Sequence, residues 1–403
     1  MNACGLIVEY NPFHNGHLYH LKEAKRTSGS DCMIAVMSGN FLQRGEPAIM
    51  DKHYRAKAAL LSGVDLVLEL PYAFAVQSSD LFAKGSVFTL AQMGVSTICF
   101  GSESGDIHDF ISSYHTFKQN ERGFQQSLKS HLEQGVAYPE ASRQAYQEIG
   151  LARQSMDLTQ PNNILGFSYV KAILENGLEI TPSTIKRTNS QYHDQSLSGE
   201  ISSATSIRRE ILNSGLITDK ATKTLPKETL NLLEEYRTAT SAWHHWEKYF
   251  HLLHYKVMTM TTSQLSRIQG VDEGLEYRLK KTAKQAINMN EWLHAIKTKR
   301  YTWTRLQRMF THLLTNTTKK DMEGIMGAAS IPYVRLLGMS QAGQSYLSQV
   351  KKGLETPLIT SLGGNAHPML SMEEKAAYAY YSILPPKVRQ EFQKQELSPP
   401  VRI

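Results

Sequence analysis

Short apolar runs alternate with amphipathic helical patterns along the first hundred residues of the chain. The apolar runs span residues 4–9, 32–37, 66–70 and 97–100, and each has the length of a buried strand. Helical patterns lie between them, at residues 18–26, 52–61 and 80–93. This alternation predicts βαβ units, and therefore a parallel sheet that helices cover on both faces.

Small and polar residues follow each of these predicted strands, in the segments 11–17, 38–47, 71–72 and 101–103. Ligands of open α/β sheets bind beyond the carboxyl ends of the strands, where such loops meet. We therefore expect the chemistry of this protein to lie in these loops. Asn40 and Arg44, from the second loop, are candidate contacts for a second substrate, whereas the charged residues 51–57 that follow predict a solvated helix face.

Beyond residue 105 the patterns become mainly helical. Residues 106–154 are polar and helical, Pro161 signals a helix start before residues 164–175, and residues 180–186 predict one more short strand. From residue 216 helical patterns dominate, for example at 230–236 and 306–314. The expected architecture is α/β: a Rossmann-like parallel-sheet domain at 1–215 with a helical insertion near 106–160, followed by a mainly helical domain at 216–403.

The composition of the 403 residues is that of a globular protein, with 41% hydrophobic and 20% charged residues. No apolar stretch has the length that crosses a bilayer, and the N-terminus lacks a signal-peptide pattern, so we expect a cytoplasmic protein without a membrane partner. Cys4, Cys32 and Cys99 form no CxxC pair, which favours buried structural thiols over a zinc or redox site. The oligomeric state stays open.

The segment Tyr-Asn-Pro-Phe-His-Asn-Gly-His at residues 10–17 joins the first predicted strand to the first predicted helix. A helix N-terminus offers unpaired N–H groups to phosphate, and Gly16 allows close approach of a nucleotide. His14 and His17 can donate hydrogen bonds as charge develops on a phosphate. Nucleotidyl transfer is therefore the first hypothesis, with simple capping or surface histidines as the alternative.

A second helix start, at residues 202–208, repeats hydroxyl groups before Arg208. The hydroxyls either only cap the helix or form a second phosphate cradle in which the arginine neutralises charge. Lys186 and Arg187 end a predicted strand on the ligand side and are either ligand contacts or a solvated pair. Asn162 either caps the helix that follows or contacts an adenine edge.

Cations cluster with aromatic residues between residues 278 and 308, where Glu291 is the sole acid. This composition suits an RNA backbone and unstacked bases, although a basic helical surface over core aromatics is the alternative. The candidate RNA-binding residues are Lys281, Lys297, Lys299, Arg300, Arg305 and Arg308. A histidine-rich stretch at 244–254 fits a polar helical stripe better than a zinc site, and we predict no protein metal site.

The motifs at 11–17 and 201–208 resemble those of the HIGH-type nucleotidyltransferase superfamily. Within it, residues 5–17, 38–47 and 299–302 are similar to the family of bacterial tRNA(Met) cytidine acetate ligases, and this resemblance extends over nearly the whole chain. The family implies that acetate attacks the α-phosphate of ATP and that acetyl passes from acetyl-adenylate to the wobble cytidine of elongator tRNA(Met). The product is N4-acetylcytidine, and Mg²⁺ is expected to bridge phosphate oxygens.

The resemblance implies catalytic roles for His14, His17 and Arg208. The residues expected to bind ATP are Ile7, Tyr10, Asn11, Gly16, His17, His20, Gly101, Asn162, Arg187, Thr188, Ser203 and Ser206. The closest rival interpretation is a metabolic adenylyltransferase that acts on a small phosphorylated acceptor. A protein of another class, a non-catalytic nucleotide-sensing or RNA-binding module, does not require an intact His14, His17 and Arg208.

Overall fold

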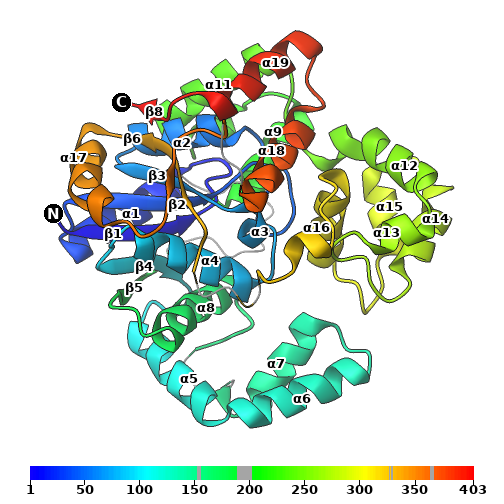
Figure 1. Cartoon of the computed structure of the whole chain (residues 1–403), viewed down its shortest axis with the longest axis horizontal. Helices are drawn as coiled ribbons and strands as arrows, with labels where there is room; N and C mark the ends of the chain where they lie inside the picture. The colour runs from blue at the N-terminus through cyan, green and yellow to red at the C-terminus, as the bar shows by residue number, and fades with distance from the viewer. Residues whose placement is uncertain (152–155, 188–201, 326, 328–329, 364–366) are drawn as a thin grey trace.

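The computed structural model describes residues 1–151, 156–187, 202–325, 327, 330–363 and 367–403. In these residues eight strands form one sheet in the order β5-β4-β1-β2-β3-β6-β7, and β8 also pairs with β6 (Figure 1). The strands are β1 (Ala3–Val8), β2 (Cys32–Ser38), β3 (Leu66–Leu70), β4 (Thr97–Ser102), β5 (Thr181–Lys186), β6 (Val334–Met339), β7 (Leu358–Ile359) and β8 (Val401–Arg402). The first five strands are parallel, which confirms the predicted parallel sheet.

The strand order reverses at β1, which pairs with β2 on one side and with β4 on the other. Helices α1 (Asn15–Ser28) and α2 (Lys52–Leu61) follow β1 and β2, whereas α3 (Tyr72–Ala75) and α4 (Ser79–Gln92) lead back across the sheet to β4. Because right-handed crossovers in opposite directions lie on opposite faces, both faces are covered. A crevice therefore opens where the loops after β1 and β4 diverge.

The polar region after β4 is a helical insertion, as predicted. It contains α5 (Ile107–Gln119), α6 (Glu121–Glu133) and α7 (Tyr138–Glu148), which form the lower part of the molecule in Figure 1. Pro161 occupies the first turn of α8 (Pro161–Glu175), where its missing N–H costs no hydrogen bond. Helix α8 packs against α4 and returns the chain to β5, which confirms the short strand expected there.

Helices dominate the chain from residue 204 to residue 322. They are α9 (Ala204–Ser214), α10 (Asp219–Thr222), α11 (Lys227–Thr240), η2 (Trp246–Tyr249), α12 (Phe250–Thr259), α13 (Thr262–Ser266), α14 (Leu275–Ala283), α15 (Met289–Ile296), α16 (Trp303–Leu314) and η3 (Lys320–Met322). Helices α12 to α16 form a separate lobe beside the sheet, on the right of Figure 1. This region has the helical character that the sequence predicts.

The C-terminal part of the chain returns to the sheet, which the helical patterns after residue 216 do not predict. Strand β6 pairs antiparallel with β3, and β7 and β8 flank β6. The remaining elements are α17 (Gln341–Val350), η4 (Lys351–Gly353), α18 (Pro368–Tyr381), α19 (Pro386–Lys394) and η5 (Gln395–Leu397). A short apolar run such as Val334–Met339 does not distinguish strand from helix by periodicity, so only its partner β3 decides its conformation. A domain division at residue 216 stays a prediction.

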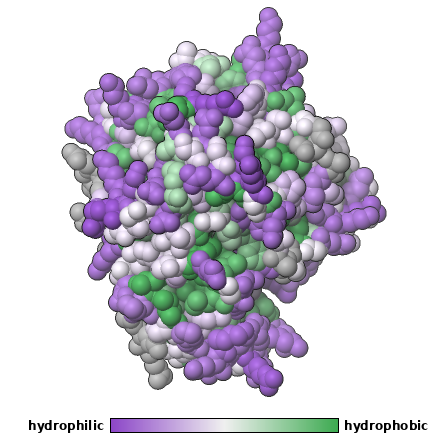
Figure 2. Space-filling model, turned by 60° about the vertical axis from the view of Figure 1, so that its left-hand side comes forward, coloured by the Kyte–Doolittle hydropathy of each residue, from purple (hydrophilic) through white to green (hydrophobic). Residues whose placement is uncertain are grey.

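The surface is mainly hydrophilic in the view of Figure 2, with apolar side chains gathered in the middle of its lower half. None of the helices among the described residues combines the length and the apolar character that crossing a membrane requires. Cys4, Cys32 and Cys99 are buried in β1, β2 and β4 with free thiols, which confirms that they pack in the core.

The charged start of α2 is buried, so the expectation of a solvated helix face was wrong. The Lys52 ammonium lies 2.8 Å from the Glu69 carboxylate on β3 and 2.9 Å from the Glu396 carboxylate. Arg335 on β6 contacts the same two carboxylates, at 2.7 Å and 2.6 Å. All four side chains are at most 4% exposed. The C-terminal strand partners bury this cluster, which the sequence around Lys52 alone does not reveal.

We predict that Arg335→Met lowers the free energy of unfolding by about 3–5 kcal/mol, because two buried carboxylates lose a cation. The shift of the urea unfolding midpoint, followed by circular dichroism, measures this loss. Lys129→Met breaks a solvent-exposed pair with Glu133 and should leave the midpoint unchanged. Equal midpoints for Arg335→Met and the wild type would contradict a stabilising role of this cluster.

Candidate active site

The two histidines of the first motif form the start of α1. The His14 Nδ1 accepts a hydrogen bond from the Gly16 amide at 3.0 Å, and the His17 Nδ1 accepts one from the His14 amide at 3.3 Å. The two rings stack with centroids 3.8 Å apart. Because each Nδ1 is an acceptor, the proton of each neutral ring is on Nε2. The same residues thus cap the helix and keep an N–H donor for a ligand.

Burial keeps these imidazoles uncharged. It lowers the pKa of His14 to about 3, and the cations Arg187 and Arg208 lower it further. Burial also holds the pKa of His17 well below its ordinary value, with His14 and Arg187 adding to the effect. The pKa of His20 falls to about 4 for the same main reason. The histidines therefore act at neutral pH as hydrogen-bond donors without positive charge.

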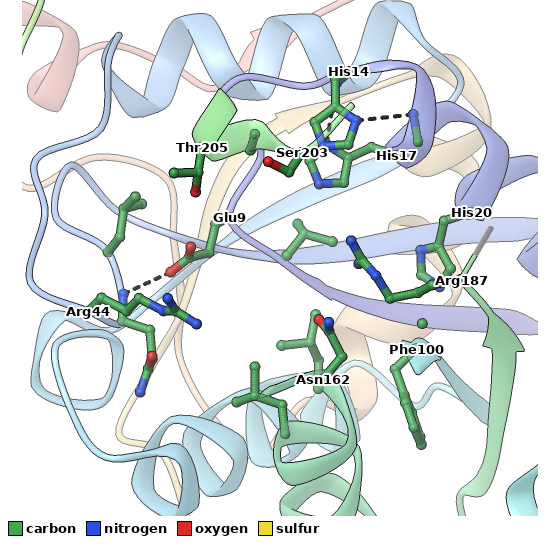
Figure 3. Close-up of a pocket in the computed structure, with 18 of the residues that line it drawn as sticks. Glu9, His14, His17, His20, Arg44, Phe100, Asn162, Arg187, Ser203 and Thr205 are labelled. Carbon is green, nitrogen blue, oxygen red and sulfur yellow. Dashed lines mark hydrogen bonds between the residues drawn. The ribbon is translucent and has the colours of Figure 1, made fainter. Parts of the chain in front are cut away.

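His14, Gly16, His17 and His20 line one pocket, together with Ile7 at the end of β1. In Figure 3 the rings of His14 and His17 lie next to Ser203, and His20 lies beside Arg187. The structure therefore brings these predicted residues together at the crevice beside β1, where the fold places a ligand.

Tyr10 and Asn11 support this pocket from behind and are not among its lining residues. The Tyr10 ring is buried and packs edge-on against the His17 ring, with centroids 5.0 Å apart. The Asn11 Oδ1 accepts a hydrogen bond from the Ile49 amide at 2.8 Å. The geometry of both residues is therefore that of supports for the histidine loop, although we predicted direct ATP contacts.

The second motif caps a helix and also reaches the pocket. Ser203 caps α9 by accepting a hydrogen bond from the Ser206 amide at 3.1 Å, and it also lines the pocket. Ser206 is buried behind it, where its hydroxyl donates to the Ser203 carbonyl at 2.8 Å. Arg208 lines the pocket and donates to the Asn11 carbonyl at 2.9 Å and to Glu46 at 3.0 Å.

The ends of β4 and β5 and the first turn of α8 form the wall opposite His14 and His17. Gly101, Asn162, Lys186 and Arg187 all line the pocket. The Asn162 side chain donates to the Glu103 carboxylate at 2.6 Å, and a Cβ on Gly101 would lie 3.4 Å from the Arg187 side chain. Thr188, the remaining predicted ATP contact, lies outside the described residues.

The two candidate second-substrate residues both lie in the loop after β2, but their surroundings differ. Arg44 lines the pocket, whereas the Asn40 Oδ1 accepts a hydrogen bond from the Lys52 amide at 2.9 Å at the start of α2. Gly45, between them and α16, has a φ of 88°, and a Cβ there would lie 2.4 Å from the Arg308 amide nitrogen. The backbone of this loop therefore packs directly on α16, and only glycine fits that contact.

The predicted tRNA-binding residues divide into two groups. Lys281, Lys297, Lys299 and Arg300 are exposed on the α14–α15 side of the helical lobe, and Arg300 pairs with Glu273 at 2.8 Å. Arg305 is half-buried, and Arg308 donates to the Gln77 carbonyl at 3.3 Å. Burial lowers the pKa of Arg308 to about 10, and Arg305 and Arg44 add to the effect.

The aromatic residues of the same stretch belong mainly to the core of the lobe. Trp292 and Tyr301 are buried, whereas Tyr277 is 66% exposed. The exposed cations therefore support the RNA-binding hypothesis more strongly than the aromatic residues between them do. Buried His244 accepts or donates hydrogen bonds with Tyr236 and Tyr249. Across the ranges that the structure covers, no group of three or more His, Cys, Asp or Glu could hold a metal ion.

The sequence did not reveal several residues that line the pocket. Glu9, Tyr19, Leu42, Gln43, Glu46, Phe82, Phe100, Leu165, Tyr169, Ile185, Ala204 and Thr205 also line it. Glu9 and Glu46 could have been suspected, since they flank the predicted strand ends. Phe82, Leu165 and Tyr169 come from α4 and α8, whose inward faces resemble any other core-facing helix in sequence.

Comparisons with known proteins agree with this site. Residues 1–396 match the family model of the HIGH Nucleotidyl Transferases. A protein from Oceanobacillus iheyensis named tRNA(Met) cytidine acetate ligase is 53% identical over 403 residues, with 100% of both chains covered. One of the same name from Bacillus subtilis is 45% identical over 399 residues, which cover 98% of this chain and 96% of the relative.

Solved structures agree as well. Crystal structures of Thermotoga maritima TmcAL, one apo and one bound with alpha-thio ATP, are 31% identical to the chain, with TM-scores of 0.90 and 0.89 and full coverage of both chains. The fold is thus that of a nucleotidyltransferase. The chain belongs to the HIGH nucleotidyl transferases and, within them, to the tRNA(Met) cytidine acetate ligase family.

The low pKa of His14 predicts a pH dependence of stability. Below its ordinary pKa of 6.5 the unfolded chain protonates His14, whereas the folded chain resists protonation down to about 3. The unfolded state then binds more protons, so stability falls as pH falls. His14→Asn keeps an acceptor for the Gly16 amide. We predict that the unfolding free energy of this variant depends less on pH than that of the wild type. Between about pH 6 and pH 4 its slope against pH should be smaller by about 1 kcal/mol per pH unit.

Urea unfolding of the ligand-free protein at several pH values measures this slope. Exposed His294→Asn serves as the matched control for replacing a histidine. An unchanged slope in His14→Asn would show that the ring is not held neutral in the folded protein.

Proposed function

We propose that this protein activates acetate with ATP and transfers the acetyl group to the wobble cytidine of elongator tRNA(Met), giving N4-acetylcytidine. The observation that carries the proposal is the stacked, uncharged pair His14 and His17 at the start of α1, in one pocket with Arg208. Its support from relatives is the shared name of proteins that match the chain from end to end.

ATP occupies the pocket between α1, α8 and α9 in this proposal. The start of α1 at Gly16 holds phosphate with backbone N–H groups. Gly101, Asn162 and Arg187, on the opposite wall, contact the nucleoside, and the predicted contact Thr188 follows directly in sequence. The alpha-thio ATP bound to the Thermotoga maritima neighbour supports this assignment. Ile7 and His20 complete the wall between the two loops.

The first step joins acetate to the nucleotide. An acetate oxygen attacks the α-phosphorus, and pyrophosphate leaves. The Nε2–H donors of His14 and His17 stabilise the charge that develops on the α-phosphate, and Arg208 with Ser203 holds the departing pyrophosphate. Neutral imidazoles suit this task, since they donate hydrogen bonds without trapping the anionic product.

Mg²⁺ accompanies ATP in this proposal, and it neutralises phosphate charge when bound. Protein cages for Mg²⁺ are uncommon at nucleotide sites, where phosphates and waters supply most ligands. The residues around the pocket fit that pattern, because the described chain offers no cluster of three metal-binding side chains.

The second step moves acetyl to RNA without a covalent enzyme intermediate. The exocyclic amine of the cytidine attacks the acyl carbon, and AMP leaves. Residues 1–215 form the catalytic domain in this proposal. RNA binding is assigned within 216–403 to the lobe α12–α16, whose exposed cations Lys281, Lys297, Lys299 and Arg300 contact the phosphate backbone, with Arg305 and Arg308 nearer the pocket.

The test uses purified protein, ATP, Mg²⁺ and labelled acetate, with and without total tRNA, followed by nucleoside analysis. We expect label in N4-acetylcytidine with the wild-type protein. His17→Asn should reduce acetate-dependent pyrophosphate release by about 10²-fold or more, because one hydrogen-bond donor to the α-phosphate is lost. Binding of tRNA to His17→Asn should match the wild type. Pyrophosphate release with a small phosphorylated acceptor, and no labelled nucleoside, would instead indicate a metabolic adenylyltransferase.

The RNA surface has its own test. We predict that Lys299→Ala combined with Arg300→Ala weakens tRNA binding and lowers the slope of log affinity against log salt by about 1–2, as expected for two lost phosphate contacts. Acetate-dependent pyrophosphate release without tRNA should survive.

Lys351→Ala with Lys352→Ala is the matched control, since both lysines are exposed after α17, away from the helical lobe (Figure 1). Filter binding at several salt concentrations compares the three proteins. Equal affinities for all of them would move the RNA surface elsewhere.

A further inference from the structure

The pocket extends past the residues assigned to ATP. Its far end is lined by Glu9, Leu42, Arg44, Phe82, Tyr169 and Thr205. In Figure 3 the Glu9 side chain projects into the pocket between Ser203 and Thr205 on one side and Arg44 on the other, whereas Arg187 and His20 lie at the opposite end. This second compartment has apolar and aromatic walls that include Glu9 and Arg44, and the Glu46 carboxylate lines the same pocket.

Glu9 is held firmly in this position. Its backbone carbonyl accepts a hydrogen bond from the buried Arg55 guanidinium at 2.6 Å. One carboxylate oxygen accepts a hydrogen bond from the Gln43 amide at 2.8 Å. Helix α2 thus fixes the backbone of Glu9 and the loop after β2 fixes its side chain, while the half-buried carboxylate still faces the pocket.

A carboxylate at this place requires a particular kind of ligand group. The phosphates of ATP and acetate are anionic, so Glu9 repels these groups, and the proposed function places the adenosine at the opposite end of the pocket, beside Arg187. An N–H donor is the complementary partner, and an exocyclic amine of a nucleobase is such a donor. Burial and the nearby Glu46 carboxylate raise the pKa of Glu9, while the hydrogen bond from the Gln43 amide and the cations Arg44 and Arg208 oppose the rise. A carboxylate with a raised pKa accepts a proton more readily near neutral pH.

This end of the pocket also borders the helical lobe. The Gln43 side chain donates to the Gln77 carbonyl at 2.7 Å, and Arg308 on α16 donates to the same carbonyl at 3.3 Å. Thr311 of α16 donates to the Gly45 carbonyl. An RNA that lies on the basic lobe therefore reaches the Glu9 end before it reaches the nucleoside end.

We propose that the Glu9 end of the pocket receives the acceptor cytosine, and that Glu9 accepts a hydrogen bond from its exocyclic amine and takes the amine proton during acetyl transfer. This inference rests on the proposed function and assigns a catalytic residue to its second step. Phe82 and Tyr169 supply the apolar and aromatic walls that a flipped-out base needs.

The transfer is balanced as follows. The amine nitrogen attacks the acyl carbon of acetyl-adenylate and forms the N–C bond. The bond from that carbon to the phosphate oxygen breaks, and AMP leaves with the electron pair. One amine proton passes to the Glu9 carboxylate, which later releases it to solvent. A uracil in the same place would present its O4 oxygen to the carboxylate, so Glu9 also selects cytosine.

The experiment separates the two steps. Acetate-dependent exchange between ATP and labelled pyrophosphate reports adenylate formation, and a single turnover with synthetic acetyl-adenylate and tRNA reports transfer. Glu9→Gln keeps an oxygen for the Gln43 amide but is no base. We expect exchange within about threefold of the wild type and transfer slower by about 10²-fold or more, the usual contribution of a general base.

Two further readouts distinguish proton transfer from a structural role. The wild-type transfer rate should fall at low pH as Glu9 becomes protonated, and Glu9→Gln should lack this acid limb. Glu9→Asp keeps the base one methylene further back and should recover part of the transfer rate. Glu133→Gln, on an exposed pair of α6, is the control carboxylate and should match the wild type in both assays.

Each outcome decides between the assignments. A parallel loss of exchange and transfer in Glu9→Gln, with an unchanged circular dichroism spectrum, would place Glu9 in the nucleotide or Mg²⁺ step and overturn this proposal. Wild-type transfer by Glu9→Gln would overturn it as well. A wild-type protein that makes no N4-acetylcytidine from acetyl-adenylate would instead overturn the proposed function itself.

Discussion

One buried guanidinium holds together the two loops on which the site is built. Arg55, on the first turns of α2, has no solvent exposure and donates to the carbonyls of Glu9, Ser38, Gly39 and Met50. The carbonyls of Glu9, Ser38 and Gly39 lie where the chain leaves β1 and β2, and that of Met50 lies just before α2. Each one would cost about 1–3 kcal/mol if it stayed buried without a donor. The position of Glu9, and of the histidine loop two residues further on, depends on this single side chain.

A second set of contacts joins this frame to the rest of the molecule. Arg208 on α9 binds the Asn11 carbonyl and the Glu46 carboxylate, and Gln307 on α16 reaches the same carboxylate at 3.4 Å. The loop at Gly45 therefore contacts Arg208, which lines the pocket, and the helical lobe at once. An adenylate-forming pocket and a basic lobe need such a shared wall if an RNA base is to reach a bound acetyl-adenylate.

The site works with neutral donors in a cationic surrounding. Arg44, Arg187 and Arg208 line the pocket, and His14 and His17 stay uncharged because burial and these cations disfavour a further proton. Long-range attraction of polyanions thus comes from the arginines. In the proposed function, fixed Nε2–H groups stabilise the transition state locally, and they need no reorganisation during the reaction.

Local periodicity determined much of this protein. The sequence predicts the positions of β1 to β5, of the main helices between them and of the histidine turn. It can do so because strand and helix patterns depend on neighbours in the chain. The burial of Lys52 and Arg55, the strand β6 and the place of Glu9 in the pocket were decided by tertiary structure. A charged helix start predicts a solvated face. Here Glu69 and Glu396, from distant segments, pair with Lys52, and all three side chains are buried. Only contacts between such segments set the local dielectric and the available partners, and no local pattern encodes them.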